Sequence, residues 1–306
     1  MSYDSVLIAT DGSDLTERAV GHALGLAETY GATVHALSVV DTKAVSLADE
    51  GFSADRRLLD ALEGGCRRAV DAVERRAAER GLETVTAVRT GAPAARIRAY
   101  ADEEDVDLIA VGTRGRQGVA RRLLGSVAWS VLAHTDRPVL TARALRGVAA
   151  APATPGYGDV LVPTDGSAGA GRAAEHAVDI ASRYGATVHA LSVIDTGPAV
   201  SPPFLAGLEE ASEAALAGVE RLAEAAGVPV RTRVWRGAPA ACIRGYADEE
   251  DVDLIAVGVH DRRGLDRFLD RSVTRRVVPT VDQPVLTLHG GDRRGSGTAD
   301  GANDLS

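Results

Sequence analysis

The sequence predicts an α/β protein made of two tandem domains, each with a five-stranded parallel sheet and flanking helices. The chain repeats itself, since DSVLIATDGS at residues 4–13 recurs as GDVLVPTDGS at 158–167, and YGATVHALSVVDT at 30–42 recurs as YGATVHALSVIDT at 184–196. Within each copy, short apolar runs typical of buried strands alternate with longer helical patterns. This alternation indicates a doubly wound parallel sheet with right-handed crossovers.

The repeat also sets the expected domain limits. RTGAPAARIRAYADEEDVDLIAVG at 89–112 recurs as WRGAPAACIRGYADEEDVDLIAVG at 235–258, so the offset between the copies falls from 154 to 146 residues. The second copy has therefore lost eight residues between 196 and 235. An Ala/Pro/Gly-rich stretch separates the copies, and the chain ends in a segment with almost no apolar residues. We expect a first domain at 1–143, a linker at 144–156, a second domain at 157–289 and a disordered tail at 290–306.

Local signals place the elements of the first copy in order. Val6 to Ala9 is an apolar run of the buried-strand type. Ser13 can cap the helix that follows, which is expected to run to Tyr30 and to stop at Gly31. Residues 33–39 are the second expected strand.

The same signals continue through the rest of the copy. A long helix with an apolar stripe is expected at 54–80, and it ends at Gly81. A third strand is expected at 84–88, and Pro93 can occupy the first turn of the next helix because its missing N–H costs nothing there. The remaining elements are a fourth strand at 107–111, a helix at 126–133 and a fifth strand at 138–141.

Composition excludes several classes of function. A formal net charge of −9 and a pI near 5.3 argue against a nucleic-acid binder, which needs a basic face. No apolar run approaches the roughly 18 residues that span a bilayer, so no membrane contact is expected. Two cysteines, Cys66 and Cys242, allow neither a disulfide framework nor a metal site. We expect a cytoplasmic protein in which equivalent histidines serve packing rather than metal binding.

A loop with spaced glycines follows the expected fourth strand. Its pattern is Gly112, two residues, Gly115, nine residues, Gly125 and then Ser126. Gly112 and Gly115 can adopt positive φ and let backbone N–H groups approach a phosphate. Ser126 is a natural N-cap, and its N–H and that of Val127 would face an anion at the helix N-terminus. Four nearby arginines, 114, 116, 121 and 122, add a positive field. Spacing alone does not separate this interpretation from an ordinary surface loop.

Two other strand ends are candidate ligand contacts. The first strand ends in Ala9, Thr10 and Asp11, and the Asp11 carboxylate could bond ribose hydroxyls, an adenine amine or a metal ion. Asp11 could equally make an Asx turn before Ser13. The backbone of Val39, at the end of the second strand, could meet an adenine edge, although the pattern also fits a plain strand end.

These residues together resemble the ATP-binding members of the universal stress protein family over about 2–143 and 157–289. The resemblance implies Rossmann-like domains of the adenine nucleotide alpha-hydrolase type, which bind ATP with or without Mg²⁺. It implies contacts to the adenosine end from Asp11 and Val39, and contacts to ribose and phosphates from the glycine loop. The candidate site residues are Ala9, Thr10, Asp11, Val39, Gly112, Thr113, Arg114, Gly115, Gly125, Ser126 and Val127.

The family dimerises through the last strand of its sheet. The resemblance therefore implies an internal pseudo-dimer, in which PVLT at 138–141 faces PVLT at 284–287. A further homodimer stays open.

The second copy departs from the glycine pattern. Asp165, Val193, Gly258 and Ser272 keep their places, as the sequence shows. Asp261 replaces the second glycine, which adds a Cβ and a negative charge where phosphate would lie, and Arg271 replaces the third. We expect this copy to bind ATP far more weakly or not at all. A rival interpretation makes Arg271 a new phosphate ligand.

The first functional hypothesis is a nucleotide-binding stress-response protein, with ATP in the N-terminal domain and a structural or regulatory C-terminal domain. Two alternatives remain. One is a slow Mg²⁺-dependent ATPase or phosphotransferase, for which Asp11 is the sole candidate base. The other is an interaction module without nucleotide, which the intact glycine loop disfavours. No catalytic residue and no metal ligand is predicted.

Overall fold

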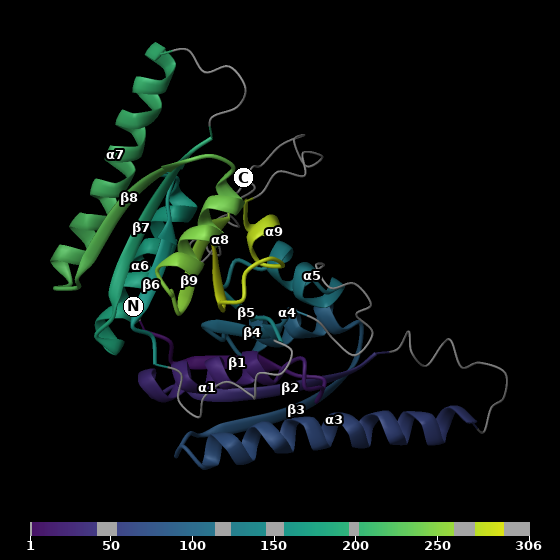
Figure 1. Ribbon diagram of the computed structural model, residues 1–306. Coiled ribbons are helices and arrows are strands. Elements are labelled where there is room, and N and C mark those ends of the chain that lie inside the picture. The colour runs from purple at the N-terminus through teal and green to yellow at the C-terminus, as the bar shows by residue number, and fades with distance from the viewer. Residues whose placement is uncertain are drawn as a thin grey trace, which may run out of the picture.

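The computed structural model describes residues 2–41, 54–113, 124–144, 156–195, 202–259 and 273–290 (Figure 1). Its strands in the first domain are β1 (Ser5–Ala9), β2 (Thr33–Asp41), β3 (Thr84–Gly91), β4 (Leu108–Gly112) and β5 (Val139–Ala142). Those in the second are β6 (Asp159–Pro163), β7 (Thr187–Ile194), β8 (Val230–Arg236), β9 (Leu254–Val259) and β10 (Val285–His289).

Helices alternate with these strands, as the repeat predicts. The first domain contains α1 (Glu17–Tyr30), α3 (Ala54–Ala78), α4 (Pro93–Glu103) and α5 (Ser126–His134). The second contains α6 (Ala168–Tyr184), α7 (Pro202–Ala225), α8 (Pro239–Glu249) and α9 (Val273–Val277). The predicted α/β fold class of two tandem domains is confirmed. In Figure 1, α3 and α7 lie at opposite ends of the molecule, each over the outer strands of its own domain.

The strands form one sheet of ten, in the order β3-β2-β1-β4-β5-β10-β9-β6-β7-β8. Within each domain the described neighbours pair in parallel. The two domains join where β5 and β10 pair antiparallel, with Leu286 opposite Leu140 and Val285 opposite Thr141. The junction covers two strand edges that would otherwise offer unpaired backbone groups to other chains.

Reciprocal tyrosine–histidine contacts form a second junction between the domains. Tyr3 OH lies 2.6 Å from His176 Nδ1, and Tyr157 OH lies 3.1 Å from His22 Nδ1. Both pairs of rings are stacked, at interplanar angles of 23° and 11°. All four side chains are buried, so each hydrogen bond satisfies polar groups that water does not reach. Since equivalent residues of the two copies exchange partners, the junction has approximate two-fold symmetry.

The other equivalent histidines also pack against tyrosines. His35 Nδ1 lies 3.0 Å from Tyr100 OH, and His189 Nδ1 lies 2.9 Å from Tyr246 OH. The expectation that equivalent histidines share their packing is thus confirmed.

The predicted ends of the first helix are half right. The helix stops at Gly31, which adopts the left-handed conformation with φ of 67°. Its start is wrong, because α1 begins at Glu17 with Thr16 as its N-cap, and Ser13 does not cap it. The Thr16 hydroxyl donates to the Ser13 carbonyl, which holds residues 13–16 as a turn.

The second domain starts its first helix one turn earlier. Ser167, the equivalent of Ser13, accepts a hydrogen bond from Ala170 N and caps α6. This early start brings the backbone of α6 against the end of β9. A Cβ at Gly169 would lie 2.6 Å from the Val259 carbonyl oxygen, and a Cβ at Gly258 would lie 2.5 Å from the Gly169 carbonyl oxygen. Two glycines therefore permit a packing that the first domain does not have.

Acid should weaken the junction between the domains. Burial, with a smaller contribution from Arg18 and Arg172, lowers the pKa of His22 and of His176 from 6.5 to about 4. Asp179 opposes this shift at His176. These histidines bind protons more weakly in the folded chain than in the unfolded chain. Their contribution to the free energy of unfolding is therefore fully present above pH 6.5. It should fall by up to about 1.4 kcal/mol per pH unit for each histidine as the pH drops toward 4.

Urea denaturation at a series of pH values measures this slope. The double variant His22→Gln/His176→Gln keeps a polar partner for each tyrosine and removes the titrating groups, so its slope should be shallower. The exposed His134 provides a matched control, His134→Gln, with the wild-type slope. An unchanged slope in the double variant would contradict this account.

The close packing of α6 on β9 gives a stability prediction. Gly258→Ala should destabilise the chain by about 1 to 3 kcal/mol, because its Cβ would overlap the backbone of Gly169. Gly171→Ala, in the same domain, is the control. It adds a methyl group to α6 with no atom within 4 Å and should stabilise the chain by about 0.5 to 1 kcal/mol. Chemical denaturation measures both, and equal effects would refute the proposed contact.

Candidate functional site

The strand order creates a crevice between β1 and β4. The chain leaves β1 for its neighbour β2 on one side, and it returns from β3 to β4 on the other side. Ligands of doubly wound sheets bind at such a switch point, at the carboxyl ends of the strands. Ala9 pairs with Val111 across it, so the residues that follow each strand meet at one edge.

Hydrogen bonds fix the turn that follows β1. Thr10 is buried, and its hydroxyl accepts from Gly12 N at 3.0 Å. The same hydroxyl lies 3.1 Å from the Thr16 hydroxyl, which itself donates to the Ser13 carbonyl. Gly12 adopts a φ of 71°, which favours glycine. The predicted site residue Thr10 thus organises the turn through its side chain.

Asp11 makes the Asx turn that the sequence allowed. Its Oδ1 atom accepts from Ser13 N at 3.0 Å and from the Ser13 hydroxyl at 2.6 Å. The side chain is half-buried at the edge of the sheet. The carboxylate is therefore held in one orientation beside the crevice. A group that binds the hydroxyls of a ligand needs such a fixed orientation.

A backbone hydrogen bond joins the two ends of the glycine loop. Thr113 N donates to the Ala142 carbonyl at 3.2 Å, and Gly125 N donates to the Thr113 carbonyl at 2.6 Å. Gly112 does not use positive φ, so that expectation is wrong. Its lack of a side chain serves close approach instead, since a Cβ would lie 2.9 Å from Thr16 Cγ2 and 3.1 Å from Thr16 Cα. Arg114 and Gly115 lie outside the described residues.

The helix after the loop begins where predicted, but its N-cap lies one residue earlier than predicted. Gly125 is the N-cap of α5, and Ser126 is its first helical residue, so Ser126 is not the cap. Glycine has no side chain to bond the first turn, and no side-chain cap is present. The N–H groups of Ser126 and Val127 consequently have no partner within the helix. This is the arrangement that accepts an anion.

Val39 lies on the neighbouring strand at the same edge. Leu37 pairs with Ala9, so Val39 sits two residues further toward the carboxyl end of β2. Its side chain is half-buried against the cluster that contains Leu7 and Ile97. The structure therefore brings the end of β2, the β1 turn and the two ends of the glycine loop to the same edge.

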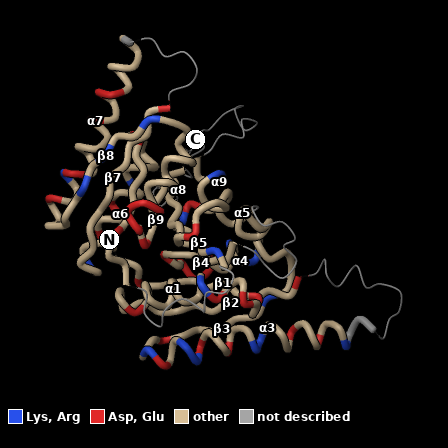
Figure 2. The backbone as a smooth tube through the Cα atoms, viewed as in Figure 1, with Lys and Arg blue, Asp and Glu red and all other residues tan. Residues whose placement is uncertain are grey.

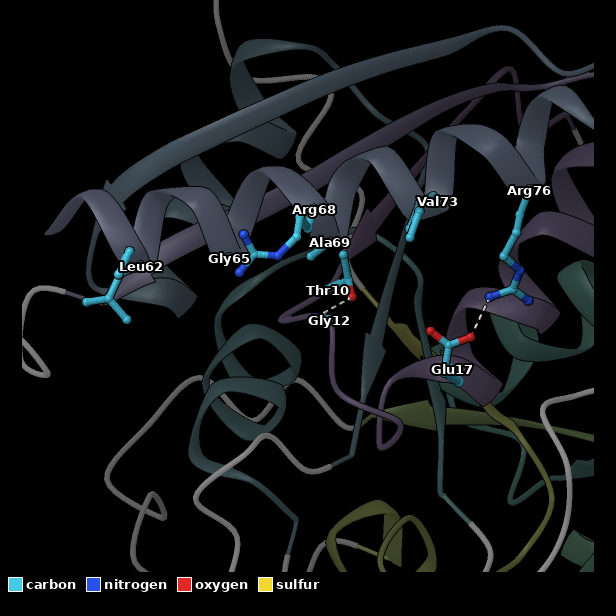
Figure 3. A pocket seen from close by; sticks show the side chains of 11 residues that line it. Thr10, Gly12, Glu17, Leu62, Gly65, Arg68, Ala69, Val73 and Arg76 are labelled. Carbon is cyan, nitrogen blue, oxygen red and sulfur yellow. Dashed lines mark hydrogen bonds and ion pairs between the residues drawn. The ribbon is translucent and has the colours of Figure 1, made fainter. Parts of the chain in front are cut away.

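A cavity of about 240 Å³ lies between the β1 turn and α3 (Figure 3). Among the described residues that line it, Thr10 is the sole predicted site residue, and Gly12 of the same turn lies beside it. The α3 residues that line it recur every three or four positions and so form one helix face. They are Ala61, Leu62, Gly65, Arg68, Ala69, Ala72, Val73 and Arg76, and Glu17 of α1 completes the lining.

Sequence reasoning missed the charged members of this lining. Arg76 Nη1 lies 2.7 Å from Glu17 Oε2, which ties α3 to the first turn of α1. Arg68 lies along α3 beside Gly65 (Figure 3). The available signal was the helical spacing of Arg68 and Arg76, which places both beside the apolar stripe. An apolar stripe predicts packing and says nothing of the charged side chains beside it.

The equivalent helix of the second domain carries a different charge. α3 contains six arginines and five acidic residues, whereas α7 contains one arginine and five glutamates. Figure 2 shows blue and red segments along α3. The sequences of the two helices correspond through Gly81 and Gly227, which follow α3 and α7 and have φ of 70° and 67°. Asp261, Arg271 and Ser272 lie outside the described residues.

Two broader properties follow from the described residues. None of their helices is both long and apolar enough to cross a membrane. Nor do these residues include a cluster of three or more His, Cys, Asp or Glu side chains that could hold a metal ion.

The chain is similar to known proteins over nearly its full length. The sequence model of the Universal stress protein family matches residues 2–143 and 156–289. A universal stress protein of Mycolicibacterium smegmatis is 30% identical over 296 residues, covering 92% of this chain and 96% of that relative. The crystal structure of a universal stress protein from Archaeoglobus fulgidus has a TM-score of 0.72 at 20% identity, covering 95% of this chain and 98% of that chain.

A smaller solved protein matches part of the chain. It is a universal stress protein in complex with cAMP, with 27% identity and a TM-score of 0.36 over 44% of this chain and 99% of that chain. With both repeats matched by the family model and a full-length relative at 30% identity, this chain belongs to the universal stress protein family.

Proposed function

We propose that this chain binds ATP in its first domain and acts in the stress response. The observation that carries the proposal is the meeting of three segments at the switch point between β1 and β4. Gly112 packs against the turn after β1, and Gly125 returns to Thr113 at the other end of the glycine loop. The intact motif therefore begins and ends beside that turn, where ligands of such sheets bind.

The residues at this edge suit the two ends of the nucleotide. The first-turn N–H groups of Ser126 and Val127 suit phosphate oxygens, and Arg114 and Gly115 belong to the same loop by sequence. Asp11 suits ribose hydroxyls or the adenine amine, and the backbone of Val39 suits the adenine edge. Mg²⁺ would enter with the phosphates, because it keeps several waters and commonly binds through substrate oxygens.

The second domain has a structural or regulatory role in this proposal. Its glycine motif is interrupted by Asp261 and Arg271. Its α7 helix is acidic and would repel phosphate. The antiparallel pairing of β5 with β10 supports an internal pseudo-dimer of domains 1–143 and 157–289. A cytoplasmic location is part of the same proposal.

Calorimetric titration of the full chain with ATP tests the site. Wild type should bind one ATP per chain. Gly115→Asp should weaken binding at least tenfold, because a carboxylate a few ångströms from phosphate costs several kcal/mol, about 4 at 4 Å. Gly118→Asp adds the same charge at a glycine outside the motif and serves as the matched control.

Stoichiometry tests the second domain. Asp261→Gly should leave one ATP per chain, since Arg271 still replaces the third glycine of that motif. Two ATP per wild-type chain would refute the degraded site. An unchanged affinity in Gly115→Asp would show that the nucleotide binds elsewhere.

A further inference from the structure

The cavity beside the β1 turn contains an arginine that no described residue neutralises. Arg76 is paired with Glu17 at 2.7 Å, so these two charges cancel. Arg68 is exposed, and its guanidinium has no ion-pair partner among the described residues. A net positive charge therefore faces the cavity from α3.

The Arg68 guanidinium lies beside two glycines of the preceding turn. A Cβ at Gly64 would lie 3.5 Å from Arg68 Nη1, and a Cβ at Gly65 would lie 3.8 Å from Arg68 Nη2. The guanidinium thus rests over the bare backbone of the preceding turn. Figure 3 shows it along α3 on the side of the cavity that Thr10 approaches from β1. The fork of N–H donors therefore lines the cavity, where it suits an anion such as phosphate.

The second domain lacks each charged member of this lining. Its packing against the sheet is equivalent, since Ala69 and Val73 of α3 correspond to the buried Ala215 and Val219 of α7. At the positions of Arg68 and Arg76, however, α7 has Ala214 and Leu222. Gly171 takes the position of Glu17. The same helix face is thus charged in the domain with the intact glycine motif and uncharged in the other.

We propose that Arg68 is an anion ligand supplied by α3, which contacts a phosphate group of the nucleotide from the face of the sheet opposite α5. This inference rests on the proposed binding of ATP to the first domain. It assigns a function to a helix that the glycine motif does not include. It also explains why α3 and α7 differ in charge while they pack alike.

Binding of three probes separates this inference from the proposed function. Wild type, Arg68→Ala, Arg68→Lys and Arg75→Ala are titrated with ATP, adenosine and tripolyphosphate. Arg68→Ala should weaken ATP binding about tenfold and leave adenosine binding within about twofold, because only the phosphates are lost as partners. Arg68→Lys should recover part of the loss. Arg75→Ala removes an exposed arginine of the same helix outside the cavity and should match wild type.

The outcomes are distinguishable. If wild type binds ATP and Arg68→Ala changes neither ATP binding nor the ratio of ATP to adenosine affinity, the inference is overturned and the proposed function stands. If wild type binds tripolyphosphate through Arg68 but not ATP, the anion ligand stands and the proposed function fails. If wild type binds neither ATP nor tripolyphosphate, both the inference and the proposed function fail. Thermal unfolding of each variant shows that the fold is retained.

Discussion

The antiparallel pairing of β5 with β10 is the constraint on which the arrangement of the molecule depends. It extends one sheet across both domains and brings Tyr3 and Tyr157 to the histidines of the opposite domain. Because strands within each domain are parallel, antiparallel pairing at the junction turns the carboxyl edges of the two halves in opposite directions. The two candidate sites therefore lie at opposite edges of one sheet. Each could diverge in sequence without disturbing the other or the junction between them.

The two halves differ where a ligand would bind and agree where the fold is built. Thr16 holds a turn before α1, while Gly169 lets α6 begin earlier and close on β9. The helices α3 and α7 bury equivalent residues and present opposite net charges. Packing constrains the buried face of each helix through apolar contacts, whereas the face toward the sheet edge is constrained by whatever it binds. The asymmetry is thus concentrated at the edge.

Much of this fold could be predicted because its signals are local. The repeat, the glycine at position 31 and Pro93 at the start of α4 each specify an element through backbone geometry alone. Helix starts were less predictable, since Thr16 and Gly125 compete with neighbouring serines for the cap. The Tyr3–His176 contact joins residues 173 positions apart, and no periodicity reports it. Arg68 was missed for a related reason, because a charged residue beside an apolar stripe has no role until the opposite wall is known.

The central claim is that nucleotide binds at one edge of the sheet and not at the other. Hydrogen exchange of the full chain, read by mass spectrometry with and without ATP, tests it most directly. Exchange should become slower at residues 9–16 and 124–130 on addition of ATP, and it should stay unchanged at residues 163–170 and 254–259. Equal protection of both sets, or protection confined to the second domain, would contradict it.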